Sequence, residues 1–158
     1  MSKRFPVTLA TNFLDKLGIT YVKHTYDYQR KGSDVAAEGL GVGLHDVIKT
    51  LIMQRDGGEP IVVLQHGDKE VSHKDLARQI GAKNAESSDV KDAQRHAGYL
   101  VGGISPFGTK RQMPVYAEET ILHLGKFYIN GGQRGFVLEM TPAELLKALR
   151  VTPIKVAR

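Results

Sequence analysis

The chain has 158 residues, of which 41% are hydrophobic and 25% charged, a composition typical of one soluble globular domain spanning residues 1–158. It contains no cysteine, which excludes disulfides, thiolate metal ligands and a cysteine nucleophile. The formal net charge of +5 suggests a polyanionic partner. No apolar run is long enough to cross a bilayer, and residues 1–6 lack the apolar core of a secretory signal, so we expect a cytoplasmic protein that does not bind membranes.

The N-terminal part of the chain predicts a helix, a strand and a second helix. Apolar residues recur at helical spacing over residues 9–17, with Thr8 as the N-cap and Gly18 at the C-terminal end. Residues 19–26 are rich in Tyr, Val, Ile and Thr, which favours a strand. Residues 33–38 predict a short helix.

Two β-hairpins are predicted further along the chain. Residues 47–53 and 61–64 are apolar and flank the turn Asp56-Gly57-Gly58, which indicates an antiparallel hairpin of doubly buried strands. Residues 127–130 and 136–140 flank a second turn that is rich in glycine. Such hairpins argue against a doubly wound parallel sheet.

Helices are also predicted at residues 72–80, at 90–97 and from Thr141 onward, where a cap and a proline mark the start. A short strand is predicted at residues 114–117. The alternation of helices and hairpins predicts the α/β class, with a mixed, mostly antiparallel sheet or partly open barrel and flanking helices.

The segment from Gly98 to Gly108 has an unusual pattern. Tyr99–Val101 predicts a buried strand, and Gly102-Gly103 and Ser105-Pro106 follow it directly. Paired glycines at a strand end indicate a tight turn or a place where a ligand approaches the backbone. In the second case, exposed backbone N–H groups could bind a carbonyl or a phosphate.

Lys49 lies in an otherwise apolar segment, where lysine is unusual. Its ammonium could extend to the wet face of the strand, or it could point into a cleft and stabilise a negative charge. The histidines, including His66 and His73, do not have metal-ligand spacing, and no phosphate-loop or dinucleotide motif occurs. We therefore predict no metal and no cofactor.

Four segments resemble, in order and spacing, the YbaK-type aminoacyl-tRNA deacylases, which are relatives of the editing domain of bacterial prolyl-tRNA synthetase. These segments are His24–Tyr26, Ile48–Leu51, Gly98–Pro106 and Gly131–Gly135. The similarity extends over residues 9–149, and the third segment is its most specific part.

This resemblance implies a hydrolase that cleaves the ester between a wrong amino acid and tRNA, with Cys-tRNA(Pro) as the first expected substrate. Lys49 matches the essential lysine of the family and is the expected catalytic residue. The residues expected to bind the substrate are Tyr26, Thr50, Gly102, Gly103, Ile104, Ser105, Asn130 and Arg134. The implied partners are aminoacyl-tRNA and prolyl-tRNA synthetase.

Ester hydrolysis needs a stabilised oxyanion and a nucleophile. We expect Lys49 and the backbone N–H groups of Gly102 and Gly103 to hold the oxyanion. The sequence shows no obvious catalytic Ser-His-Asp set. Water, the thiol of the substrate or its 2′-hydroxyl is therefore expected to attack.

Three departures from the family pattern leave the amino acid open. Asn130 stands where close relatives have Ser, and Val137 where some have a polar residue. The loop from Tyr28 to Asp34 is shorter and lacks the His-Asp-Pro sequence of the best-known members. Alanine, serine or another small amino acid is an alternative substrate. A non-catalytic module that binds tRNA or protein is a further alternative.

Overall fold

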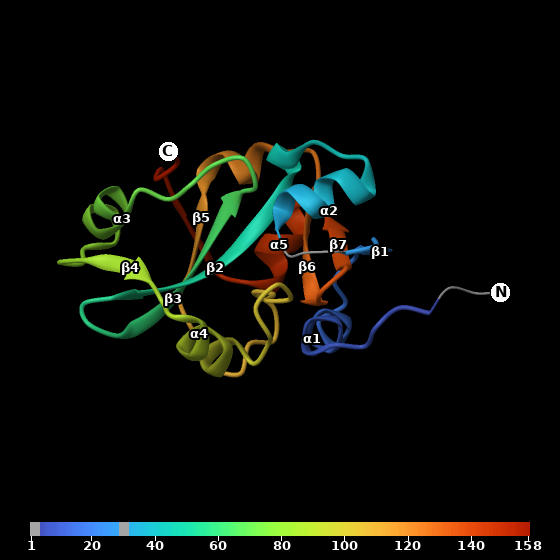
Figure 1. The fold of residues 1–158 in the computed structure, drawn as a ribbon, viewed down its shortest axis with the longest axis horizontal. Coiled ribbons are helices and arrows are strands. Elements are labelled where there is room, and N and C mark those ends of the chain that lie inside the picture. Colours follow the sequence, from blue (N-terminus) through green and yellow to red (C-terminus); the bar gives the residue numbers. More distant parts are fainter. Residues whose placement is uncertain (1–3, 29–31) are drawn as a thin grey trace.

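The computed structural model describes residues 4–28 and 32–158 (Figure 1). The helices of these residues are α1 (Leu9–Lys16), α2 (Ser33–Leu40), α3 (His73–Ile80), α4 (Val90–Ala97) and α5 (Pro142–Ala148), with the short 3-10 helices η1 (Leu44–Asp46) and η2 (Glu119–His123). The strands are β1 (Val22–Thr25), β2 (Val47–Arg55), β3 (Glu59–His66), β4 (Ala85–Ser87), β5 (Val115–Glu118), β6 (Phe127–Gln133), β7 (Phe136–Met140) and β8 (Val151–Ile154). The loop that the sequence predicts to be short includes residues 29–31, which lie outside the described residues, as do residues 1–3.

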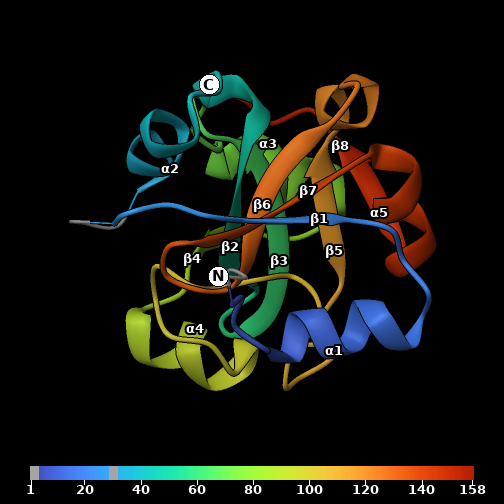
Figure 2. The same ribbon diagram turned by 90° about the vertical axis from the view of Figure 1, so that its right-hand side faces the viewer.

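The strands form one mixed sheet in the order β1-β7-β6-β2-β3-β5-β8, and β4 pairs with β2 beside this path. Antiparallel pairings join β1 to β7, β7 to β6, β2 to β3 and β2 to β4. Parallel pairings join β6 to β2, β3 to β5 and β5 to β8. The sheet curls, so that β1 and β7 cross in front of β2, β3 and β5 in Figure 2. The predicted fold class is confirmed.

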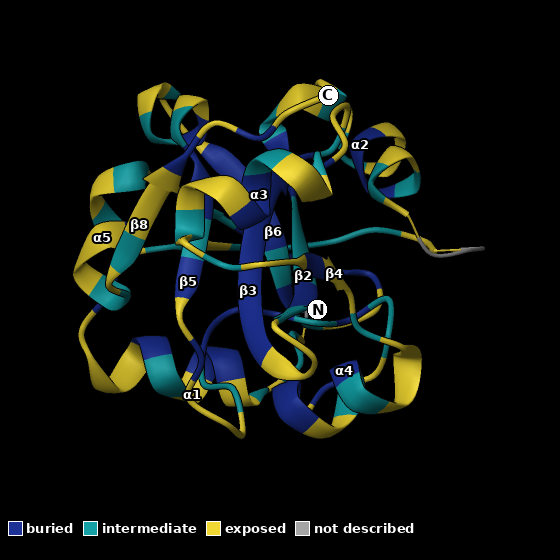
Figure 3. Cartoon of the chain, turned by 90° about the vertical axis from the view of Figure 1, so that its left-hand side faces the viewer, coloured by how far each residue is buried: buried dark blue, intermediate teal, exposed yellow. Residues whose placement is uncertain are grey.

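Strand β3 lies at the centre of the core because it has a strand on each side and packed side chains on both faces. Every residue of β3 except the first is buried, and it forms a continuous buried ribbon in Figure 3. One apolar cluster, which includes Leu64 and Ile129, fills the inside of the curled sheet. A second cluster, which includes Val63 and Leu76, lies under α3. This burial explains the apolar run of β3.

Local chemistry sets the helix ends where the sequence predicts them. The Thr8 hydroxyl accepts a hydrogen bond from the Thr11 N–H, and Thr141 accepts one from Glu144 in the same way. Gly98 ends α4 with a φ of 82°, in the left-handed region that favours glycine. These helices are confirmed to within one or two residues at each end.

The prediction of a strand at Tyr99–Val101 is wrong, because this segment forms a bend that leads into a turn. Tyr99 is buried, and its hydroxyl donates to the Phe107 carbonyl at 2.5 Å, which closes the loop on itself. Leu100 is 71% exposed, so the apolar run does not pass through the core. Strand β1 is also shorter than predicted, and β4 and β8 were not predicted.

Candidate functional site

A gap in the sheet defines the candidate site. One edge of β2 pairs with β6 at Val47 and Ile48, and the same strand pairs with β4 from Met53 to Arg55. Between these pairings, residues 49–52 have no strand partner on that edge within the described residues. We call this opening the β2 gap.

The ladder geometry turns the backbone of Thr50 toward the β2 gap. The Val47 carbonyl accepts a hydrogen bond from the Gly67 N–H at 2.7 Å, on the β3 side of the strand. In an antiparallel pair the N–H and C=O groups of successive residues point to alternate edges. The backbone groups of Thr50 and Ile52 therefore point to the other edge, where the Ile52 carbonyl accepts from the Ser88 N–H at 3.2 Å.

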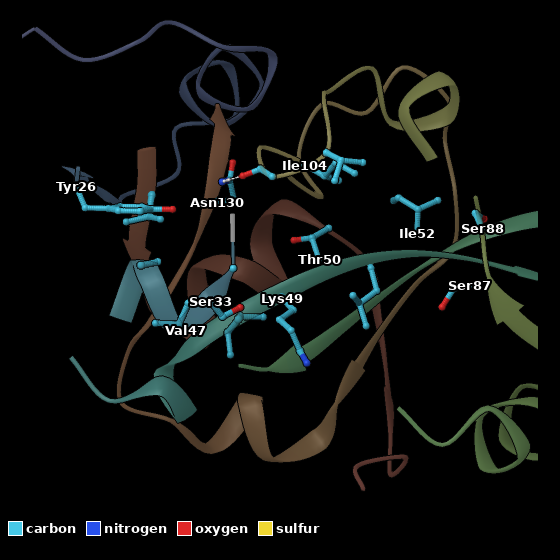
Figure 4. A pocket seen from close by; sticks show the side chains of 17 residues that line it. Tyr26, Ser33, Val47, Lys49, Thr50, Ile52, Ser87, Ser88, Ile104 and Asn130 are labelled. Carbon is cyan, nitrogen blue, oxygen red and sulfur yellow. Dashed lines mark hydrogen bonds between the residues drawn. The ribbon is translucent and has the colours of Figure 1, made fainter. Parts of the chain in front are cut away.

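A pocket of about 510 Å³ surrounds the β2 gap and extends to both faces of the strand (Figure 4). Thr50, Ile52, Ile104 and Ser88 lie on one side of β2 in this view, and Lys49 lies on the other. The expected site residues that line the pocket are Tyr26, Lys49, Thr50, Gly102, Ile104 and Asn130. Gly103, Ser105 and Arg134 do not line it.

Two hydroxyl groups in the pocket are buried without a hydrogen-bond partner. They belong to Thr50 and Ser88, and they are the only buried side-chain polar atoms in this state among the described residues. Native proteins pair nearly all buried polar groups, so these two hydroxyls are free to bond with a ligand or with water in the pocket. Ser88 was not predicted, because no motif marks it and it reaches the pocket only through the unpredicted strand β4.

The turn between β6 and β7 holds the opposite wall of the pocket. The Asn130 side-chain amide donates to the Gly102 carbonyl at 3.1 Å, and Arg134 Nε donates to the Val101 carbonyl at 3.0 Å. The Asn130 Oδ1 in turn accepts from the Gly132 N–H at 2.6 Å. Asn130 and Arg134 therefore position the loop, and Arg134 does so from outside the pocket.

The Gly103 N–H is not available to a ligand, because it donates to the Leu100 carbonyl at 2.9 Å. The expectation that Gly102 and Gly103 together supply oxyanion donors is therefore wrong for Gly103. The N–H groups of Gly102 and Ile104 have no acceptor in the part of the chain that the structure describes. A trans peptide directs each N–H opposite to the preceding carbonyl, so the Gly102 N–H points away from Arg134.

Close backbone packing explains why residue 103 is glycine. A Cβ at this position would lie 2.9 Å from the Gln133 Cα and 3.0 Å from the Arg134 nitrogen. It would collide with the β6–β7 turn and not with a substrate, which corrects the interpretation of this residue as pocket wall. Ser105 is fully buried, and its hydroxyl accepts from the Phe107 N–H at 3.3 Å, so it stabilises the loop.

The Lys49 side chain lines the pocket and is 19% exposed. Its ammonium donates to the Lys69 carbonyl and lies 3.5 Å from Glu70 Oε1. In Figure 4 it points away from Asn130 and Ile104. The structure thus brings Lys49 and Gly102 to one pocket without bringing the ammonium to the glycine.

Tyr26 follows β1 and closes the end of the pocket near α2. Burial raises the pKa of the Tyr26 hydroxyl above its usual value, so this group is protonated at neutral pH. It can therefore form hydrogen bonds, but it cannot serve as a general base there.

A cluster of His45, His66 and Asp68 lies apart from the pocket lining, with ligand atoms within 4.8 Å of one another. The two imidazole rings stack at 3.7 Å and 6°, so their in-plane lone pairs lie in parallel planes that one ion cannot share. Both ring nitrogens of His66 have partners, the His45 carbonyl at 2.7 Å and the Thr120 hydroxyl at 2.6 Å. The cluster is a hydrogen-bond network that joins η1, β3 and η2.

Comparison with known proteins identifies related sequences. A sequence profile described as the aminoacyl-tRNA editing domain matches residues 29–148. An Enterococcus faecalis protein, provisionally named Cys-tRNA(Pro)/Cys-tRNA(Cys) deacylase EbsC, is 28% identical over 141 residues, which cover 88% of this chain and 86% of that protein. The proline–tRNA ligase of Ralstonia nicotianae is 26% identical over 116 residues, 71% of this chain but only 20% of the ligase.

Solved structures share the fold. The crystal structure of the hypothetical protein APE2540 superposes with a TM-score of 0.87 at 23% identity, covering 95% of this chain and 99% of that one. A structure provisionally described as a trans-editing enzyme for prolyl-tRNA synthetase superposes with a TM-score of 0.82 at 20% identity, covering 93% and 94% of the two chains. Among the described residues, no helix has the length and apolar character that a membrane crossing requires.

Proposed function

Because the chain belongs to the family of YbaK-type aminoacyl-tRNA editing domains, we propose that it is a deacylase, which hydrolyses the ester between a wrong amino acid and tRNA. Cys-tRNA(Pro) is the first candidate substrate, in keeping with the name of the Enterococcus faecalis relative. The observation that carries the proposal is the pair of unpartnered hydroxyls, of Thr50 and Ser88, in the pocket that Lys49 also lines.

The amino acid is proposed to occupy the end of the pocket near α2. Ala36, Val47 and Val137 line this part with small apolar side chains, and all three are buried. Such a lining suits a small side chain, because each additional methylene would need space or would displace the wall. A cysteine, alanine or serine side chain meets this requirement.

The ester is proposed to lie at the β2 gap. There the Thr50 hydroxyl and backbone N–H, with the N–H groups of Gly102 and Ile104, can donate hydrogen bonds to the carbonyl oxygen. The oxygen gains negative charge when a nucleophile attacks the carbonyl carbon, and fixed donors stabilise that charge by a few kcal/mol each, on the order of 3. Collapse of the tetrahedral intermediate then releases the ribose hydroxyl of the tRNA.

Lys49 is proposed to supply positive charge to this oxyanion. Its flexible four-carbon stem already lines the pocket, and rotation of that stem would carry the ammonium from Lys69 past the free edge of β2. Among the described residues that line the pocket, none is a histidine or a carboxylate that could act as a general base. This favours attack by water, or attack by the substrate thiol or 2′-hydroxyl, which moves the acyl group to that atom so that water must still cleave the new thioester or ester.

The test is release of amino acid from purified mischarged tRNAs without added synthetase. The panel contains Cys-tRNA(Pro), Ala-tRNA(Pro), Ser-tRNA(Pro) and the correct Pro-tRNA(Pro). We expect one of the first three to be cleared at least ten times faster than Pro-tRNA(Pro). Release at the spontaneous rate for every substrate would reject the proposed activity, and tRNA binding without hydrolysis would favour a non-catalytic module.

We propose that prolyl-tRNA synthetase selects the tRNA on which this protein acts. The repeated assay therefore includes tRNAs of other identity that carry the same amino acid, with and without the synthetase. A preference for tRNA(Pro) that arises only when the synthetase is present would support this partnership.

A further inference from the structure

A second hollow, which we call the α3–β4 groove, lies between α3 and the strand that closes the substrate pocket. Its volume is about 360 Å³. The basic residues His73, Lys74, Arg78 and Lys83 line it together with small or neutral residues. No acidic residue lines this groove in the part of the chain that the structure describes.

Part of this basic charge has no ion-pair partner among residues 4–28 and 32–158. Arg78 pairs with Asp75 at 2.7 Å, whereas Lys74 and Lys83 form no ion pair with described residues. The carboxylate of nearby Asp56 already has two partners, because it accepts a hydrogen bond from the Lys83 backbone N–H at 2.8 Å and forms an ion pair with Arg55. The ammonium groups of two lysines therefore remain available to an external anion.

Strand β4 links the groove to the substrate pocket. Ala85 lines the groove and Ser87 lines the pocket, and both belong to β4. Residues two apart in a strand lie about 7 Å from each other and face the same side of the sheet. An extended ligand that leaves the pocket past Ser87 would therefore reach the groove next.

We propose that the α3–β4 groove binds backbone phosphates in the unpaired 3′ end of the tRNA, next to the aminoacylated terminal nucleotide in the pocket. This inference rests on the proposed deacylase function. Among the described residues, no phenylalanine, tyrosine or tryptophan lines the groove, and His73 is its one aromatic ring. It therefore binds the charge of the backbone and does not read the sequence.

The experiment compares two triple variants that remove equal charge. The groove variant is Lys74→Ala/Arg78→Ala/Lys83→Ala. The control is Lys16→Ala/Lys147→Ala/Arg150→Ala, which changes three exposed residues, at the end of α1, in α5 and just after α5. Each variant is assayed for hydrolysis of aminoacyl-tRNA and of aminoacyl-adenosine, which carries the same ester but no phosphate. The binding of uncharged tRNA to each variant is measured over a range of salt concentrations.

We expect the groove variant to raise the KM for aminoacyl-tRNA at least ten-fold relative to the control, with hydrolysis of aminoacyl-adenosine unchanged. The slope of log K against log salt should fall by about 0.7 for each phosphate contact that is lost. Equal KM values and equal salt slopes for the two variants would overturn the inference.

The design separates the two proposals. If the wild-type protein hydrolyses neither substrate, the proposed function fails, and binding of uncharged tRNA still tests the groove. If it hydrolyses both but the groove variant behaves like the control, the groove assignment fails while the deacylase proposal stands.

Discussion

Thr50 and Ser88 each bury a hydroxyl group that has no hydrogen-bond partner among the described residues. A buried polar group without a hydrogen bond destabilises the fold by roughly 1–3 kcal/mol, and such a cost is common where a site is built for a ligand. The substitutions Thr50→Val and Ser88→Ala remove these hydroxyls with little change in shape.

We expect both variants to keep or gain stability, by up to about 1 kcal/mol, and to lose roughly ten-fold in kcat/KM because one substrate hydrogen bond is missing. Thermal unfolding and deacylation are measured on the same preparations. A clear loss of stability in either variant would show that its hydroxyl has a structural role instead.

Lys49→Ala is expected to lower the deacylation rate by about 10²-fold or more, because Lys49 is the one cation among the described residues that line the pocket and could stabilise the oxyanion. The fold should persist, since the ammonium bonds only to the Lys69 carbonyl and to the exposed Glu70. Lys69→Ala is the matched control, because it leaves that carbonyl in place. Near wild-type turnover by folded Lys49→Ala protein would remove Lys49 from the mechanism.

At the scale of elements, the loop over residues 98–108 and the β6–β7 turn form one unit. Asn130 and Arg134 bind two successive carbonyls of the loop, and Gly103 allows the two backbones to touch. The pocket wall therefore depends on contact between segments that lie about thirty residues apart in the chain.

Gly103→Ala should force the loop away from the turn, and we expect a loss of about 1–3 kcal/mol in the free energy of unfolding. The deacylation rate should fall together with stability, because the N–H groups of Gly102 and Ile104, which we propose bind the ester carbonyl, would move. Gly125→Ala is the control, since a Cβ there meets no atom within 4 Å. Denaturant unfolding measures the difference, and equal stability of the two variants would contradict the close contact.

At the scale of the whole molecule, the network around His66 joins η1, β3 and η2. Burial lowers the pKa of His66 below its usual 6.5, so the folded protein holds this ring neutral. Below pH 6.5 the unfolded chain binds a proton that the folded chain does not, and the free energy of unfolding falls as the pH decreases.

We expect this decrease to begin near pH 6.5 and to reach at most about 1.4 kcal/mol per pH unit from this one group. His66→Gln should flatten the profile between pH 7.5 and 5.5, whereas His73→Gln, a change at an exposed residue, should not. Denaturant unfolding at a series of pH values provides the test. Identical slopes for the wild type and His66→Gln would contradict the assignment.

Local interactions determined much of this protein from the sequence by itself. Thr8, Thr141 and Gly98 mark helix ends because capping and left-handed backbone depend on neighbouring residues alone. The two hairpins could be predicted for the same reason, and their strands contain Lys49, Thr50 and Asn130, three of the expected site residues. The motif resemblance added the remaining expected residues.

Tertiary structure alone decided the rest, because it depends on pairings between distant segments. Strands β4 and β8 are short and gain their stability from β2 and β5, so no local pattern reveals them. The β2 gap exists only because β6 and β4 pair with separate parts of β2. This spacing leaves the polar groups of Thr50 facing the gap and brings Ser88 to the pocket. For the same reason the role of Gly103 could not be inferred from its neighbours, since the atoms that forbid a Cβ belong to the β6–β7 turn.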